Sequence, residues 1–421
     1  MKDCAVYPKF RWLMLIDLCL ITAASTMVMI SPASLMGVIA KDLGLSLGAA
    51  TANFMGVFNL VVAISCICGG IVCDRLGLIP IFLFCLAMLI LPTLAMPYFG
   101  DTLRGAMVIR IFQAMGAGPI LALVSPLASL WFPVLERGIV AGFQGMSVSL
   151  GIALGFVIAP AIFEASGNWR EALSWMSVAG LIALAVTIAV TLAKKPTPPF
   201  SREGQYEANN EGVSDVRLVL KQQATWIGVL LVFCYMWVLN VFNNLTPAYL
   251  AVDSPLGMDF GPVLAGKYML GVAIASMVGA VAAGFILKKV FQGRTKPSIA
   301  IGFLVFAVFS VSIKLPFVTS NRLMLLACLM IAGFFMAWIV PNAMAFVATH
   351  YPPHVTGKVV GLWVGVGTFG GTAGVILGAM SLRQTNSYLV SILIVGCVGL
   401  IGFLLTPFLK SPAVFGLSKT K

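Results

Sequence analysis

Long apolar runs alternate with short polar segments along nearly the whole chain. Each run holds about 20 residues or more, the length that an α-helix needs to cross the hydrocarbon core of a bilayer. The pattern predicts twelve membrane-spanning helices, at residues 12–38, 47–73, 79–99, 104–131, 139–165, 171–193, 223–252, 262–290, 297–318, 322–349, 357–382 and 387–409. No small-residue cleavage site precedes the first run, which is too long for a signal peptide, so we interpret it as an uncleaved helix.

The longest polar break separates the first six runs from the last six. It covers residues 194–222 and begins with Pro196, Pro198 and Pro199, followed by charges of both signs. This composition predicts a cytoplasmic linker rather than a third domain. We expect an N-terminal six-helix bundle at 1–193, the linker at 194–222 and a C-terminal six-helix bundle at 223–421.

An internal repeat indicates that the two bundles are related. Phe132-Pro133, with glycines at 138 and 142, recurs as Tyr351-Pro352, with glycines at 357 and 361, each 219 positions later. Both copies join the fourth predicted helix of a bundle to the fifth. Parallel repeats of this kind place a binding site between the two bundles, near the middle of the membrane.

Composition and charge support a membrane protein that crosses the bilayer many times. The chain is 60% hydrophobic and only 10% charged, whereas soluble domains have about a quarter of their residues charged. Its net charge of +12 comes from basic residues scattered among short loops, which does not favour nucleic-acid binding. Most of the 26 lysines and arginines fall on one side if the N-terminus is inside. This bias predicts a plasma-membrane protein with both termini in the cytoplasm.

The sequence contains no pattern that points to an enzyme, a cofactor or a metal. Most of the nine cysteines lie inside apolar runs, and Cys66, Cys68 and Cys73 have no histidine nearby, so we expect no metal site. No Gly-x4-Gly-Lys-Ser/Thr sequence is present, which argues against an ATP-driven pump. We expect no nucleophile–base pair, hence no catalytic residues.

The first motif with a recognisable meaning is Gly70-Ile71-Val72-Cys73-Asp74-Arg75-Leu76-Gly77, between the second and third predicted helices. It resembles the loop of the major facilitator superfamily with the pattern Gly-x-x-x-Asp-Arg-x-Gly, in which the two helices approach closely. The basic residues that follow in the family are replaced by Leu78, Ile79 and Pro80. The resemblance implies that Gly70, Asp74, Arg75 and Gly77 serve conformational change.

A second motif places a charge inside the fourth predicted helix, in Arg110-Ile111-Phe112-Gln113-Ala114-Met115-Gly116-Ala117-Gly118. It resembles the family pattern Arg-x-x-x-Gly-x-Gly, whose arginine is tied to substrate binding or proton coupling. A guanidinium keeps its proton, so its place in a membrane helix requires an anion, a carboxylate or water. The alternative is a structural arginine paired with Glu164. The repeat has Leu329 at the corresponding position, so the charge is not a symmetric packing feature.

Two further segments resemble the family. Gly151-x3-Gly155-x3-Ala159-Pro160 resembles a fifth-helix motif best developed in antiporters, although helix packing alone also explains the glycines. Gly167-Asn168-Trp169-Arg170 resembles the Gly-Trp-Arg sequence that begins the sixth helix, where we expect interfacial anchoring.

Several polar side chains inside apolar runs are candidates for proton coupling and substrate binding. Asp17 and Glu164 are the candidates for proton coupling, because intramembrane carboxylates exchange protons. The alternatives are an interfacial ion pair of Asp17 with Arg11, and pairing of Glu164 with Arg110 or Arg170. The substrate-binding candidates are Arg110, Gln113, Gln144, Trp237, Asn240, Asn244, Lys267, Trp338 and Trp363. For Lys267 the alternative is an outward-reaching surface lysine.

Together these resemblances identify the chain as a member of the major facilitator superfamily. They imply an all-α membrane protein with twelve transmembrane helices in two pseudo-symmetric bundles, which moves a small organic solute by alternating access. Arg110 favours proton-coupled uptake of an organic anion, a carboxylate or sulfonate. The alternatives are proton-coupled efflux of drugs or metabolites, favoured by the fifth-helix glycines, and facilitated passage of an organic cation, favoured by the tryptophans. The expected partners are the substrate, protons and the lipid bilayer, with no nucleic acid and a monomeric state.

Overall fold

The computed structural model of the protein describes residues 8–133, 136–193, 219–351 and 353–410. Within these ranges the chain is helical and contains no strand. Among the described residues, 12 helical segments are long and apolar enough to cross a membrane. The number of spans predicted from hydropathy and the all-α class are therefore confirmed.

The described part of residues 8–193, which we call the N-half, forms one bundle. Its helices are α1 (Phe10–Ile30), η1 (Ala33–Leu35), α2 (Met36–Asp42), α3 (Leu47–Thr51), the π-helical segment η2 (Ala52–Val57), α4 (Phe58–Leu76), α5 (Leu78–Phe99), α6 (Leu103–Ala122), α7 (Val124–Trp131), α8 (Arg137–Ser166), α9 (Trp169–Ser174) and α10 (Ser177–Leu192).

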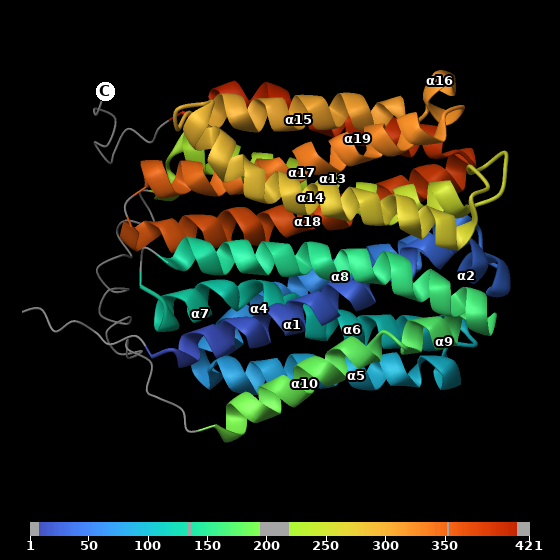
Figure 1. The fold of residues 1–421 in the computed structure, drawn as a ribbon, viewed down its shortest axis with the longest axis horizontal. Coiled ribbons are helices and arrows are strands. Elements are labelled where there is room, and N and C mark those ends of the chain that lie inside the picture. The colour runs from blue at the N-terminus through green and yellow to red at the C-terminus, as the bar shows by residue number, and fades with distance from the viewer. Residues whose placement is uncertain (1–7, 134–135, 194–218, 352, 411–421) are drawn as a thin grey trace, which may run out of the picture.

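The described part of residues 219–410, which we call the C-half, forms the second bundle. Its helices are α13 (Gln223–Ala251), α14 (Gly261–Lys289), α15 (Thr295–Ser312), α16 (Pro316–Thr319), α17 (Arg322–His350), α18 (Pro353–Thr385), α19 (Tyr388–Leu405) and η4 (Thr406–Phe408). Figure 1 shows the halves side by side, the N-half in blue to green and the C-half in yellow-green to red. Residues 194–218, most of the predicted linker, lie outside the described residues.

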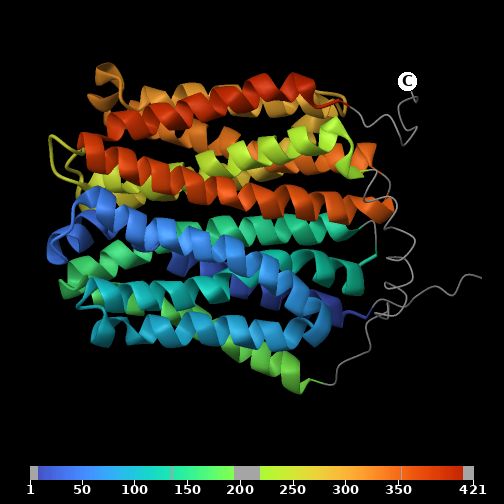
Figure 2. The same ribbon diagram turned by 180° about the vertical axis from the view of Figure 1, so that it is seen from behind.

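The first and last described helices share one end of the molecule. Figures 1 and 2 show α1 beginning and α19 ending at this end, which we call the termini end. Helices α2 and α16 lie at the opposite end, which we call the distal end. Both ends of the described chain therefore lie on the same side of the membrane that the bundle spans.

The first span is broken where hydropathy predicted one continuous helix at 12–38. Helix α1 ends at Ile30, and the chain continues through η1 into α2. Pro32 explains the break, because proline has no N–H to donate to the carbonyl of Val28 four residues earlier. The break leaves carbonyl groups near the end of α1 available for other donors.

At the distal end the two halves touch through glycines. A Cβ atom on Gly48 of α3 would lie 2.5 Å from the carbonyl oxygen of Ala379 in α18, and one on Gly56 of η2 would lie 2.9 Å from Cγ1 of Ile376. A Cβ on Gly266 of α14 would overlap the carbonyl of Phe156 in α8. Only glycine permits these approaches, so the distal end is closed.

Toward the termini end the halves separate. Gly145 in α8 and Gly365 in α18 each lie eleven residues, about three turns, before Phe156 and Ile376, so they face the opposite half. No described atom beyond their own helix lies within 4 Å of a Cβ built on either glycine. Figure 1 shows α8 and α14 diverging toward this end, and Figure 2 shows the same for α4 and α18. The structure is open at the termini end.

Candidate functional site

Helix α6 carries Arg110 into the interior of the N-half, where the residue is only 1% exposed. Its Nε donates to the carbonyl of Phe54 at 3.1 Å. Nη1 donates to the carbonyl of Val28 at 3.0 Å, and Nη2 donates to that of Met29 at 3.1 Å. The guanidinium thus joins the end of α1, the π-helical segment η2 and α6.

Two further donors of Arg110 reach side chains. Nη1 also donates to Oε1 of Gln113 at 3.0 Å, and Nη2 lies 3.8 Å from the sulfur of Met55. Gln113 in turn donates to the hydroxyl of Thr93 at 2.9 Å. The ring of Phe58 covers the guanidinium, with 4.0 Å between Cζ and the ring centroid. All five N–H groups therefore have partners, and Gln113 helps to hold the arginine.

The charge of Arg110 is solvated by dipoles rather than neutralised by a carboxylate. No described carboxylate forms an ion pair with it. Glu164, the partner considered from the sequence, is exposed, and Arg170 pairs with Asp42 and Asp101 instead. The carbonyls of α1 that receive the guanidinium are those near the break at Pro32. Local sequence thus creates the acceptor set.

Asp17 is buried between α1 and α10, inside the N-half. Its Oδ1 accepts from the hydroxyl of Thr187 at 2.7 Å, while Oδ2 is buried with no described partner. The ion pair with Arg11 considered from the sequence is not formed, because Nη2 of Arg11 pairs with Oε2 of Glu136 at 2.9 Å. Asp17 and Arg110 consequently lie in separate polar environments.

In the C-half, α13 presents polar side chains to α18. Asn240 donates to the carbonyl of Met236 at 2.9 Å and contacts Gly371, where a Cβ would overlap the amide. Trp237 packs on Gly374, where a Cβ would lie 2.9 Å from the indole. The structure therefore brings these two predicted residues together beside α18.

Several polar atoms near this α13–α18 contact are unsatisfied. Nε1 of Trp237, Oδ1 of Asn244 and Oγ1 of Thr372 are buried without a hydrogen-bond partner among the described residues. The Nδ2 of Asn244 donates to the carbonyl of Asn240 at 2.7 Å, so only its oxygen is free. Buried polar atoms of this kind are ordinarily paired, so water or a bound solute would find both donors and acceptors here.

The faces that meet between the halves carry two polar residues that the sequence analysis missed. Asn59 of α4 lies eleven residues after Gly48, and Thr372 of α18 lies four before Ile376, so both continue the contacting faces toward the termini end. Both are buried, with 6% and 5% exposure. An amide inside an apolar run was a readable signal for Asn59, whereas threonine is too common in helices to single out Thr372.

Two predicted binding residues lie inside the C-half instead. Nε1 of Trp338 donates to the hydroxyl of Ser298 at 2.8 Å, which places the ring between α17 and α15. Trp363 is fully buried against Gly228 of α13 and stacks on Phe346. Both rings fill helix interfaces within one bundle.

The remaining predicted residues lie at other places. Lys267 is exposed near the distal end of α14, as the surface alternative expected. Gln144 is half-buried and lies seven residues before Gly151, on the face of α8 that meets α1. In the Gly-x-x-x-Asp-Arg-x-Gly motif, Gly77 lies between α4 and α5 with a positive φ of 89°, a value that favours glycine. The side chains of Asp74 and Arg75, and Gly70, fall outside the described part of the structure.

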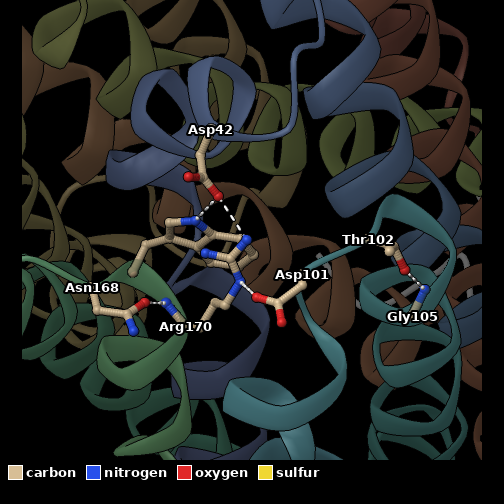
Figure 3. A network of polar contacts seen from close by, with 7 residues as sticks. Asp42, Asp101, Thr102, Gly105, Asn168 and Arg170 are labelled. Carbon is tan, nitrogen blue, oxygen red and sulfur yellow. Dashed lines mark hydrogen bonds and ion pairs between the residues drawn. The ribbon is translucent and has the colours of Figure 1, made fainter.

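The Asn-Trp-Arg sequence forms a polar network at the distal end (Figure 3). Asn168 caps α9 by accepting from the N–H of Arg170, and Nε1 of Trp169 donates to Asp42 at 3.0 Å. Nη2 of Arg170 pairs with Asp42 at 2.7 Å, and its Nε pairs with Asp101 at 3.0 Å. The network therefore ties the end of α2 and the α5–α6 loop to α9.

Comparison with known proteins identifies the family. The sequence matches the family described as "Major Facilitator Superfamily" over residues 16–312 and 268–414. It is 24% identical to a hexuronate transporter of Bacillus subtilis over 246 residues, 58% of this chain and 56% of that protein. It is 25% identical to a cis,cis-muconate transport protein of Acinetobacter baylyi over 338 residues, 77% of each chain. The chain spans about half the length of the first curated relatives that it matches.

Solved structures agree with the fold. A crystal structure of a D-xylose-proton symporter superposes with a TM-score of 0.73 at 19% identity, covering 97% of this chain and 99% of that one. The matched family profile, which covers most of the chain, and the 12 candidate spans among the described residues lead to one conclusion: the chain belongs to the Major Facilitator Superfamily.

Proposed function

We propose that the protein takes up a small organic anion, a carboxylate or sulfonate, together with protons. The termini end would face the cytoplasm, as the basic loops predict. The halves would rock around a site at mid-depth, lined by Asn59, Thr372 and the α13 residues Trp237 and Asn240. One observation carries the anion proposal: Arg110 is a buried cation that no described carboxylate neutralises.

Carbonyl dipoles stabilise the guanidinium without cancelling its charge. A unit positive charge therefore remains inside the membrane, close to the space between the halves. At an effective dielectric constant of 20, two unit charges about 8 Å apart interact by roughly 2 kcal/mol, so a negative solute gains by entering this space. The names of two relatives, a hexuronate transporter and a cis,cis-muconate transport protein, support a negative substrate.

The two alternatives receive less support from the geometry. A cation carrier needs several aromatic faces around its site, but Trp338 and Trp363 fill interfaces inside the C-half, which leaves Trp237 as the one predicted tryptophan at the proposed site. For the antiporter alternative, Gly151 and Gly155 of α8 approach Ala23 and Met27 of α1. This close contact within the N-half explains their spacing without antiport.

For proton coupling we favour Asp17. It is the described carboxylate that is completely buried, and its Oδ2 has no described partner. A proton bound there would change the contact of α1 with Thr187 of α10. Because the end of α1 also holds Arg110, movement of α1 would connect proton binding to the arginine. Glu164 is exposed and is the second candidate.

The sign of the substrate can be tested on the purified protein. We expect glucuronate, muconate or sulfoacetate to raise its thermal unfolding temperature in detergent, because a bound anion stabilises the folded state by mass action. Choline at the same ionic strength serves as the cationic comparison and should leave the unfolding temperature unchanged. Stabilisation by choline but by none of the anions would contradict the proposal and favour a cation carrier.

The proton step can be tested in proteoliposomes. We expect Asp17→Asn to keep exchange of a stabilising anion across the membrane while losing accumulation driven by an inward proton gradient, since an amide cannot carry the proton. Glu171→Gln, an exposed position on α9, is the matched control and should accumulate normally. If Asp17→Asn still accumulates substrate with unchanged pH dependence, the coupling carboxylate lies elsewhere.

A further inference from the structure

A cleft with apolar walls opens between the halves, at the side of the molecule where α8 and α14 diverge. Its volume is about 480 Å³, and its lining consists of Met146 of α8 and Met277, Val278, Val281, Ala282, Phe285 and Ile286 of α14. The two helices meet near the distal end, where Gly266 packs on Phe156, and diverge toward the termini end (Figure 1). The cleft therefore exists because the structure is open at the termini end.

The surroundings of the cleft limit what can fill it. All seven lining side chains are apolar, so water there would lack hydrogen-bond partners. Val281 and Phe285 are 55% and 66% exposed, and both belong to a helix that is long and apolar enough to cross a membrane. In a bilayer, the apolar material at this depth is the acyl chain of a lipid.

Basic residues follow the cleft at the termini end. Lys288 and Lys289 form the last turn of α14, three and four residues after Phe285, and thus on the same face of the helix. Both are exposed, and neither forms an ion pair with a described carboxylate. A lysine near the membrane surface contributes about 1 kcal/mol to the attraction of anionic lipid.

We propose that an anionic phospholipid of the leaflet at the termini end inserts an acyl chain into this cleft and places its phosphate on Lys288 and Lys289. The lipid acts as a wedge between α8 and α14. Closure at the termini end would bring these helices together and expel the chain. The bound lipid therefore stabilises the termini-open state and slows its conversion to the distal-open state. This site is separate from the central substrate site and does not depend on the proposed substrate.

Lipid titration of the purified full-length protein in detergent tests the proposal. We expect phosphatidylglycerol to raise the unfolding temperature at lower concentration than phosphatidylcholine with the same acyl chains. The double variant Lys288→Ala, Lys289→Ala should need a phosphatidylglycerol concentration about tenfold higher or more for the same rise in unfolding temperature. That concentration should then equal the one needed with phosphatidylcholine. Lys221→Ala, an exposed lysine just before α13, is the matched control and should keep the preference.

A distance measurement provides the conformational test. Spin labels on Gly145→Cys and Gly284→Cys, two positions with open space around them, report the separation of α8 and α14. Phosphatidylglycerol should increase the population with the longer distance between the two spin labels. Ala282→Phe, which fills the cleft, should remove this effect of phosphatidylglycerol. Equal stabilisation by both lipids, a preference that survives loss of both lysines, or an unchanged distance distribution would each overturn the proposal.

Discussion

Replacing Gly48 with leucine is expected to hold the transporter open at the distal end and to reduce transport at least tenfold. A Cβ at this position would lie 2.5 Å from the carbonyl oxygen of Ala379 and 2.6 Å from the N–H nitrogen of Arg383. These are backbone atoms of α18 that cannot rotate away. Leucine therefore fits only if α3 and α18 separate, and each half can keep its own fold while they do so.

A bulky residue at Gly145, which has open space around it, is expected to hold the protein in the opposite state. A Cβ on Gly145 has no described atom beyond its own helix within 4 Å, yet a leucine side chain there would project into the space that must vanish when the termini end closes. We expect this variant to remain termini-open, as the reverse of Gly48→Leu. Ala185→Leu, on the exposed face of α10, is the control for added bulk and should transport normally.

Alkylation of Gly365→Cys in a cysteine-free background distinguishes the two states. The residue lies beside the open space at the termini end, so labelling should be slower in the Gly48→Leu variant and at least as fast in the Gly145→Leu variant. If Gly48→Leu transports normally and labels as the unsubstituted protein does, closure at the distal end does not require this glycine contact.

Replacing Arg110 with lysine is expected to destabilise the N-half severely although the charge is kept. Lysine offers three donors from one atom, whereas Arg110 uses donors on three nitrogens to reach α1, η2 and α6. At least two buried acceptors would lose their partner, at about 1–3 kcal/mol each. The expected total, roughly 2–6 kcal/mol, is a large fraction of the stability of a typical domain.

Thermal unfolding in detergent measures this effect. Arg110→Lys should unfold well below the unsubstituted protein, and Arg110→Met should also be destabilised because the same carbonyls lose their donors. Arg104→Lys, at an exposed position one helix turn and a half earlier in α6, is the matched control. An Arg110→Lys protein with unchanged unfolding temperature would show that the hydrogen bonds to α1 and η2 contribute little.

Hydropathy predicted the number of spans because that number depends on long apolar runs that single residues do not disturb. It also located Arg110 inside a helix, but its partners had no signature in the sequence. Backbone carbonyls of Val28, Met29 and Phe54 are available because of a proline break and a π-helical turn, which depend on local geometry. The sequence instead suggested Glu164 as the partner of Arg110, because it is an acidic residue inside an apolar run.

Side-chain direction was the information that the sequence lacked. Helices α13, α17 and α18 are apolar on nearly every face, so periodicity does not show which face meets the other half. Trp237 and Trp338 therefore looked equivalent, although one contacts the glycine face of α18 and the other bonds to Ser298. The structure distinguishes glycines that have close neighbours from glycines that have none, and this distinction shows which helix faces are in contact.

The break of α1 at Pro32 has a consequence for sequence change over time. The carbonyl of Val28 lacks a helical donor because residue 32 is proline, and Arg110 supplies one. A residue with an N–H at position 32 would compete for that carbonyl, and loss of Arg110 alone would leave it with only the hydroxyl of Ser31, at 3.1 Å, as a described donor. The two positions are thus epistatic: substitutions that remove both should be tolerated better than either alone. Lineages that lose the buried charge are expected to restore a continuous first helix.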